Sequence, residues 1–297
     1  MNQKKKKVFY KQWSFYLILI AILASVFFIR NNSLAESEDF HLDHEIHLFT
    51  RELGSGTRAA FTEVTGITDN NGDDILSPLA TVQNSTNATM QAVASDPHAI
   101  SYISLGSLNN TVKALAINGV QAETENIQNG NYSLVRNFSV THGRELSPLA
   151  QDFWDFMFTK DAQTLVSDEG YVPVDIQTNS YEPSLLSGSI SIVGSTSVEP
   201  TIQRFAELYT SLNPDVRIDI TAPGSGAGIT AAIDGSADIG MTSRDPSEDE
   251  AADLMNTEAI AIDGIVLIVN NKNSVDNLDL EDIQKIYLEE IDFWNEI

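Results

Sequence analysis

Apolar and polar positions along the chain predict short strands that alternate with helices. Residues 46–50 alternate between apolar and polar side chains, whereas residues 262–269 form a continuous apolar run, which is typical of a buried strand. The predicted strands are residues 46–50, 99–103, 189–193, 216–220, 237–240 and 262–269. This alternation predicts an α/β protein with parallel sheets that helices cover on both faces.

The helices between these strands are predicted from apolar residues at helical spacing. Ile202, Phe205 and Leu208 lie on one face of the helix predicted for residues 198–211. The other predicted helical segments are residues 87–94, 147–166, 280–287 and 293–294, and two helices opened by the Gly-Ser-Gly turns at 54–56 and 224–226.

The first 35 residues form a targeting segment. Four lysines precede an apolar stretch from Trp13 to Ile29, and Ser33-Leu34-Ala35 provides small residues where a signal peptidase would cut. The stretch is intermediate between a signal-peptide core and a membrane span, so cleavage and retention as a membrane anchor both stay open. In either case we expect the acidic body to be extracytoplasmic, at the cell surface or secreted.

Charge and cysteine content exclude several classes of function. The formal net charge is −25, and six of the 17 Lys and Arg residues lie in the first 35 residues, where there is no Asp or Glu. The body is therefore still more acidic and lacks the basic surface that nucleic-acid binding needs. The chain has no cysteine, which excludes a disulfide framework, a Cys-based zinc site and a lipid-modified cysteine. Any anion site in so acidic a protein must depend on short-range hydrogen bonds and local dipoles.

Four loops that follow predicted strands are rich in Gly, Ser and Thr. They are residues 51–57, 194–197, 223–228 and 241–244. In parallel sheets, ligands bind at the carboxyl ends of strands, where such loops meet helix N-termini. Backbone N–H groups, close approach at glycine and rotatable hydroxyls together predict an oxyanion site, to which Arg51 adds a planar pair of donors.

Taken singly, each of these motifs has a simpler interpretation. A Gly-Ser-Gly turn is commonly a plain loop, Thr196 and Ser197 are typical helix caps, and Arg51 fits a solvated strand end. Their joint occurrence after predicted strands favours the binding site.

The sequence resembles a known family in both halves. Gly194-Ser195-Thr196-Ser197, Gly224-Ser225-Gly226 and the segment 237–244 resemble the first half of the phosphate-binding proteins of phosphate ABC transporters. Residues 51–61 resemble the phosphate loop of that family's second lobe, and the segment up to 169–173 resembles its later part. The resemblance implies a two-lobed, periplasmic-binding-protein-like fold of type II with the ligand cleft between the lobes.

The order of the halves departs from that family and indicates a circular permutation, which is tolerated where termini lie in exposed loops. The alternative is a fragment whose halves pair with another chain. The predicted lobes are 46–135 plus 268–297, carrying the Arg51 loop, and 136–174 plus 188–267, carrying the Thr196 and Ser225 loops. Residues 36–45 are predicted to be a linker, and residues 175–187 a linker at the new join.

The resemblance also implies roles for individual residues. Thr196, Ser197 and Ser225 would donate to phosphate from one lobe. The other lobe would contribute Arg51, Ser55, Gly56 and Thr57. Ser243 stands where some members of the family have an Asp that accepts a proton from phosphate, so we expect weaker discrimination against sulfate.

Binding without catalysis is the expected function. None of the five histidines has a motif-like relation to Ser55 or Ser225, so a serine hydrolase is disfavoured. His41, His44 and His47 have a spacing that a metal site could use, but a solvated linker is the simpler interpretation, and neither a metal nor a cofactor is expected. The expected partners are inorganic phosphate and an ABC permease, with membrane association through the N-terminal segment. A membrane-anchored phosphate sensor or non-transporting paralogue is the alternative.

Overall fold

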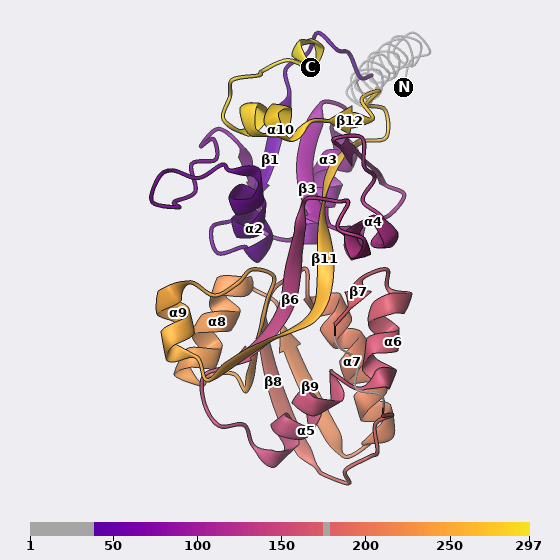
Figure 1. The fold of residues 1–297 in the computed structure, drawn as a ribbon, viewed down its shortest axis with the longest axis vertical. Helices are drawn as coiled ribbons and strands as arrows, with labels where there is room; N and C mark the ends of the chain where they lie inside the picture. The colour runs from indigo at the N-terminus through magenta and orange to yellow at the C-terminus, as the bar shows by residue number, and fades with distance from the viewer. Residues whose placement is uncertain (1–38, 175–178) are drawn as a thin grey trace, which may run out of the picture. The chain divides into compact units, whose positions relative to one another are not determined.

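Two antiparallel strands, β6 (Val135–His142) and β11 (Asn256–Asn270), form the centre of a mixed sheet in the computed structural model (Figure 1). The structure describes residues 39–174 and 179–297. The predicted targeting segment and parts of both predicted linkers lie outside this range. Within it, no helix is both long enough and apolar enough to span a bilayer.

The sheet runs in the order β2-β1-β3-β11-β6-β10-β8-β9, with β4 and β7 also paired to β11. The other strands are β1 (His47–Arg51), β2 (Thr81–Gln83), β3 (Ala99–Ser104), β4 (Val112–Ala114), β5 (Ala116–Ile117), β7 (Val172–Pro173), β8 (Gly188–Gly194), β9 (Val216–Thr221), β10 (Ile239–Thr242) and β12 (Asn277–Leu278). The helices are α2 (Gly56–Thr65), α3 (Thr86–Ser95), α4 (Thr124–Gln128), α5 (Pro148–Phe156), α6 (Lys160–Asp168), α7 (Glu199–Leu212), α8 (Ser225–Asp234), α9 (Glu248–Asp253) and α10 (Leu280–Tyr287), with short 3₁₀ turns at Leu105–Ser107 and Trp294–Glu296.

The prediction of purely parallel sheets is wrong. Strand β1 is parallel to β2 and β3, and β8 is parallel to β9 and β10, but β11 is antiparallel to β3 and β6, and β10 is antiparallel to β6. Strand β6 was not predicted, because its sequence, VRNFSVTH, mixes charged and polar residues with apolar ones. Two parallel groups are therefore joined through an antiparallel centre.

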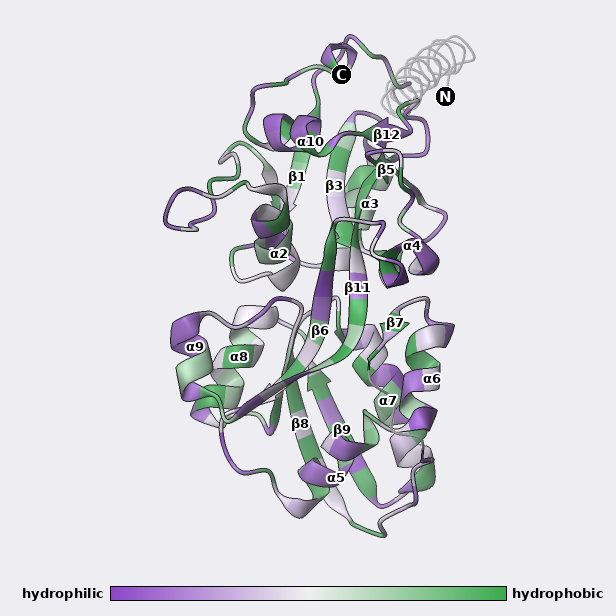
Figure 2. Cartoon of the chain, in the orientation of Figure 1, coloured by the Kyte–Doolittle hydropathy of each residue, from purple (hydrophilic) through white to green (hydrophobic). Residues whose placement is uncertain are grey.

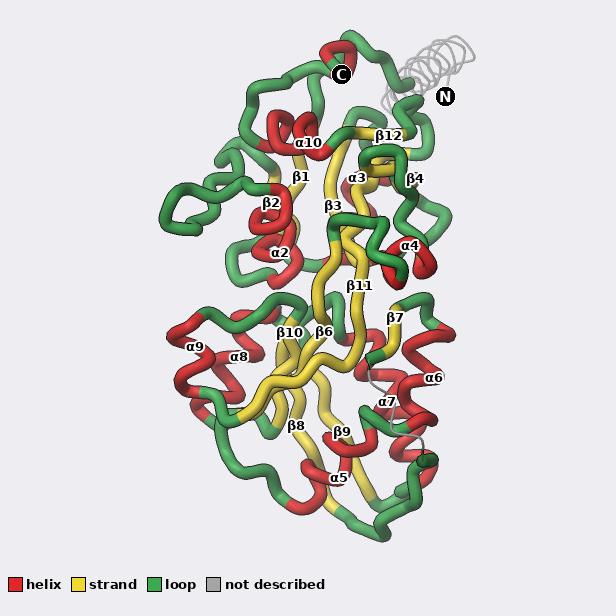
Figure 3. Tube along the Cα trace, in the orientation of Figure 1, coloured by secondary structure: helices red, strands yellow, loops and turns green. Residues whose placement is uncertain are grey.

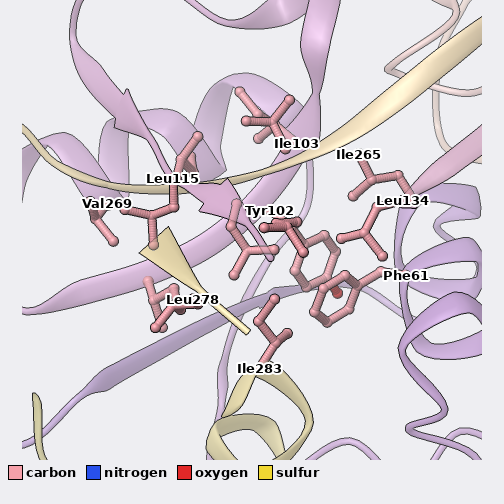
Figure 4. Packing of buried hydrophobic residues seen from close by; sticks show 14 of the residues in the cluster. Phe61, Tyr102, Ile103, Leu115, Leu134, Ile265, Val269, Leu278 and Ile283 are labelled. Atoms are coloured by element: carbon pink, nitrogen blue, oxygen red, sulfur yellow. The ribbon is translucent and has the colours of Figure 1, made fainter. Parts of the chain in front are cut away.

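The buried apolar residues form two separate cores. The first core consists of buried apolar residues from the ranges 46–134 and 265–294, together with Val172. The second consists of buried apolar residues from the ranges 138–171, 190–241 and 260–261. We call these two parts the first lobe and the second lobe. In the first lobe the rings of Phe61 and Tyr102 stack at 3.9 Å between centroids (Figure 4). Residues 265–267, which the sequence analysis assigned to the other lobe, pack in this first core.

Strands β6 and β11 are shared by the two lobes. Both run from one lobe into the other, as the strand tubes of Figure 3 show. On β11, Ala261 belongs to the second core and Ile265 to the first, while on β6 Phe138 belongs to the second core and Leu134, just before the strand, to the first. The chain therefore passes between the lobes as paired strands.

The region predicted as one helix at 147–166 is two helices. Helix α5 ends at Phe156 and α6 begins at Lys160. The hydroxyl of Thr159 caps α6 by accepting a hydrogen bond from the Ala162 amide at 3.5 Å. The apolar spacing continues across the break because Phe156, Met157 and Val166 are all buried, so periodicity alone could not reveal it.

The described part of the predicted linker 36–45 packs against the first lobe from Phe40 onward. Phe40 contacts Trp294 edge-to-face at 5.7 Å between ring centroids, and Glu45 forms a β-bridge with Phe293. The His44 ring stacks on that of His98 at 4.4 Å, where a solvated linker was expected. The described residues contain no cluster of three or more His, Cys, Asp and Glu side chains that could hold a metal ion.

Two carboxylates tie the described part of the second linker to the second lobe, one of which is Asp161, which accepts a hydrogen bond from the Tyr181 amide at 2.8 Å. Asp152 on α5 accepts hydrogen bonds from the hydroxyls of Tyr181 (2.6 Å), Ser184 (2.8 Å) and Tyr209 (2.5 Å). Burial, followed by the contact with Asp152, raises the pKa of the Tyr209 hydroxyl, so this group stays a protonated donor. Asp152 thus holds the linker and α7 to the same helix.

We expect Asp152→Ala to lower the free energy of unfolding by about 2–3 kcal/mol, because three hydroxyls lose a charged acceptor. Urea denaturation followed by circular dichroism measures this change. Asp155→Ala is the matched control, because Asp155 lies on the same helix and accepts only an exposed bond from Gln151. Equal stability of the two variants would show that the Asp152 contacts contribute little.

Candidate functional site

Four loops that follow parallel strands meet at the boundary between the lobes. Strand β1 ends at Arg51 in the first lobe, whereas β8, β9 and β10 end at Gly194, Thr221 and Thr242 in the second. Because parallel strands end at the same edge of their sheet, each lobe presents its loops together. A backbone hydrogen bond of 3.0 Å from the Gly226 amide to the Gly54 carbonyl joins the loops of the two lobes directly.

Arg51 is the charged residue at the centre of this contact. Its side chain is 2% exposed, and its Nε and Nη2 atoms each lie 2.8 Å from a different oxygen of Glu52. Nη2 also donates to the Thr196 hydroxyl of the second lobe at 3.1 Å. The guanidinium is therefore held in a fixed plane by a carboxylate from its own loop and reaches across the lobe boundary.

Further buried hydroxyls from both lobes belong to the same cluster. The Thr57 and Ser197 hydroxyls lie 2.9 Å apart across the boundary. Within the second lobe, Ser243 Oγ lies 3.3 Å from Ser225 Oγ and accepts a hydrogen bond from Ser195 Oγ at 3.0 Å. All five residues are buried. Because a hydroxyl can both donate and accept, each of these groups can turn its hydrogen toward an anion.

Glycine allows the two lobes to come this close. A Cβ atom on Gly56 would lie 2.4 Å from Ser225 Oγ and 2.5 Å from Ser243 Oγ. Gly194, with φ of +153°, leaves no room for a side chain, because a Cβ there would lie 1.9 Å from the Met241 carbonyl oxygen. Any other residue at these two positions would place its Cβ atom in space that neighbouring atoms already occupy.

Three helices begin at this cluster, at Gly56 (α2), Thr86 (α3) and Ser225 (α8). The first turn of a helix has unpaired N–H groups and a partial positive charge, and none of these three first turns contains an acidic residue. The surroundings of Arg51 are therefore suited to an anion, although the protein as a whole is strongly acidic.

Most of the predicted site residues lie together. Contacts within this cluster involve seven of the eight, namely Arg51, Gly56, Thr57, Thr196, Ser197, Ser225 and Ser243. Ser55 differs, because its hydroxyl caps helix α2 by accepting a hydrogen bond from the Arg58 amide at 3.4 Å. Ser225 Oγ accepts a hydrogen bond from the Ser243 amide at 3.1 Å and lies 3.3 Å from the Ser243 hydroxyl, and neither partner is a general base that would activate it as a nucleophile.

Sequence reasoning missed Thr86 and Ser195. Thr86 lies at the start of α3 in the first lobe, and its hydroxyl is 3.4 Å from Arg51 Nη1, 3.3 Å from Thr196 Oγ1 and 3.2 Å from Ser197 Oγ. The signal for Thr86 was a hydroxyl pair, Ser85-Thr86, at the N-terminus of a predicted helix. Ser195 belongs to the Gly194-Ser195-Thr196-Ser197 motif, for which the resemblance implied roles only at Thr196 and Ser197.

Comparisons with known proteins agree with this arrangement. The family model described as a PBP superfamily domain matches residues 179–296. Over 255 residues the chain is 42% identical to the phosphate-binding protein PstS 2 of Streptococcus pneumoniae, covering 85% of this chain and 87% of that protein. The chain belongs to the PstS family of phosphate-binding proteins.

Other members of the PstS family extend this comparison. PstS 2 of Streptococcus agalactiae is 40% identical over 258 residues, with 85% of this chain and 87% of that protein covered. The crystal structure of a phosphate ABC transporter phosphate-binding protein from Streptococcus pneumoniae has a TM-score of 0.69 and 42% identity, covering 85% of this chain and 99% of that one. The periplasmic-binding-protein-like fold expected from the sequence is thus confirmed.

The structure also bears on how the halves combine. Both groups of loops come from the same chain and contact each other within it. The alternative of a fragment whose halves pair with another chain stays a prediction. The match to PstS 2 of Streptococcus pneumoniae is long enough to include both lobes. The circular permutation itself stays a prediction.

Proposed function

We propose that this PstS-family protein captures inorganic phosphate outside the cytoplasm and delivers it to an ABC permease, without changing it chemically. The observation that carries this proposal is the buried guanidinium of Arg51, which lies among hydroxyls from both lobes at the start of three helices. Its relatives in Streptococcus pneumoniae carry the name phosphate-binding protein, and the structure neighbour is described as part of a phosphate ABC transporter.

The proposed mechanism is the replacement of water around phosphate by fixed donors. Arg51 Nη1 and Nη2, which donate to Thr86 and Thr196 in this structure, would donate to two phosphate oxygens in place of those hydroxyls. The hydroxyls of Thr57, Thr196 and Ser197 would rotate to donate to the other oxygens. Ser225, Ser243, Thr86 and the amides near Gly56 complete the proposed shell. Ser55 contributes through its backbone, since its hydroxyl caps α2.

Short-range contacts can hold a dianion even though the net charge of the chain is −25. Fields from surface carboxylates are screened over about 10 Å at moderate salt, whereas buried donors act at hydrogen-bond distance. Closure of the lobes about the anion would then produce the shape that a permease recognises. The proposal places residues 1–35 in export, as either a cleaved signal peptide or an anchor formed by residues 13–29.

Arg51→Ala is expected to weaken phosphate binding by about a hundredfold, because it removes the charged donor and leaves Glu52 without its partner. Isothermal titration calorimetry with inorganic phosphate measures the change. Arg217→Ala is the matched control, because Arg217 forms an exposed pair with Asp219 in the second lobe. An Arg51→Ala protein that is folded and binds like the wild type would refute the assignment.

Gly56→Ala should reduce phosphate affinity by up to about a hundredfold, because its methyl group would collide with Ser225 and Ser243 and keep the lobes apart. Gly226→Ala serves as the control in the facing loop. A Cβ there would lie 3.5 Å from Gly54 Cα, which is ordinary contact, and little change in affinity is expected. Similar losses in both variants would argue against a specific role for Gly56.

Sulfate should compete with phosphate within about tenfold, because Ser243 offers a hydroxyl that can accept from protonated phosphate but does not repel a fully ionised anion. Competition calorimetry with sodium sulfate tests this expectation. Ser243→Asp should raise the preference for phosphate by at least about tenfold, since a carboxylate accepts the phosphate proton and repels sulfate. Strict rejection of sulfate by the wild-type protein would contradict the expectation.

A further inference from the structure

A buried ion pair lies on the two strands that join the lobes. Arg136 on β6 and Asp263 on β11 are direct register partners. Arg136 Nε and Nη2 donate to the same oxygen, Asp263 Oδ2, at 3.0 and 2.9 Å. The two side chains are 3% and 0% exposed, respectively, so the pair is shielded from water.

The pair is situated where the chain passes from one core to the other. Two residues beyond Arg136 on β6, Phe138 belongs to the second core, whereas Ile265, two residues beyond Asp263 on β11, belongs to the first. In Figure 2 the middle of β6 is coloured hydrophilic where it passes between the lobes, although most of the sheet interior is apolar. The polar pair therefore lies between the two apolar cores.

Each partner reaches a loop of a different lobe. Asp263 Oδ1 accepts hydrogen bonds from the Ser104 hydroxyl at 2.8 Å and from the Leu105 amide at 3.2 Å, at the end of β3 in the first lobe. Arg136 Nη1 donates to the Ser243 carbonyl of the second lobe at 3.4 Å. Because the Ser243 hydroxyl belongs to the proposed phosphate shell, the pair connects that shell to the first lobe.

Stability alone is a weak explanation for such a pair. The desolvation of two buried charges offsets much of their attraction, and apolar replacements of similar volume are often no less stable. Burial raises the pKa of the Asp263 carboxyl and lowers that of the Arg136 guanidinium, and in each case the attraction of the other partner opposes the shift. What the pair supplies that apolar residues cannot is directional hydrogen bonding to both lobes.

We propose that Arg136 and Asp263 are positioning residues that fix the Ser243 loop relative to the first lobe and thereby set the affinity for phosphate without contacting it. This inference rests on the proposed function for its ligand. It predicts that apolar replacements of both residues leave the protein folded but change the position of the Ser243 loop and weaken phosphate binding.

The main test is the double variant Arg136→Met/Asp263→Leu in the full-length chain, purified in detergent. We expect an urea midpoint close to that of the wild type, because no unpaired charge remains, but phosphate binding at least about tenfold weaker by calorimetry. Tyr132→Phe is the control, because it removes a buried hydrogen bond to the Ile265 carbonyl on β11 within the first lobe. This control should lose stability and keep its affinity.

A second measurement records the distance between the two lobes in the absence of phosphate. The chain has no cysteine, so Gln91→Cys on α3 and Gln203→Cys on α7, both exposed, can carry spin labels specifically. Pulsed electron resonance should give a broader or shifted distance distribution in the double variant than in the labelled wild type.

The outcomes separate this inference from the proposed function. A folded double variant with wild-type affinity and an unchanged distance distribution would overturn the positioning role. If the double variant does not fold, Arg136→Lys decides, because an ammonium lacks the planar fork that donates twice to Asp263 and once to the Ser243 carbonyl. Unchanged affinity in this variant would again overturn the positioning role. If the wild-type protein itself does not bind phosphate, the proposed function fails, while the label distances still report on the pair.

Discussion

The contact of the buried Arg51 guanidinium with both lobes is the interaction on which the site depends. A guanidinium that is 2% exposed requires a full set of partners, and Glu52 from its own loop supplies two of them. Two of the remaining three N–H groups donate to Thr86 and Thr196, one from each lobe. The same geometry that satisfies the buried charge therefore gathers hydroxyls from distant parts of the chain around it.

This constraint explains how an acidic protein can serve an anion. The local field at this site is set by the Arg51 guanidinium, by the N-termini of α2, α3 and α8 and by neutral hydroxyls, and Arg58 donates to the Arg51 carbonyl at 3.0 Å. The carboxylates that give the net charge lie mostly at the surface. Glu52 neutralises Arg51 in part, but it also fixes the plane of the guanidinium. Orientation of donors, and not total charge, is thus what the fold provides.

The two lobes are joined by paired strands, which restricts how they can move. Strands β6 and β11 pair in antiparallel orientation along most of their length, with one shift of register between Ala259 and Ala261. The Arg136–Asp263 pair lies on the first-lobe side of this irregularity and is hydrogen-bonded to loops of both lobes. A sheet that bends at such a point allows closure along a defined direction, which suits a protein whose two halves must meet around one ion.

The sequence by itself determined the local chemistry of the site. A strand followed by Gly, Ser and Thr at a helix start is a short-range pattern, so Arg51, Gly56, Thr57 and Ser225 could be found without a structure. Only the tertiary structure decided which loops meet, that the central strands are antiparallel, and that Thr86 joins the cluster. Arg136 and Asp263 lie 127 positions apart, and no local periodicity records such a pairing. The physical reason is that strand register and burial of charge are settled by the whole core at once, whereas turns and caps are settled by a few neighbouring residues.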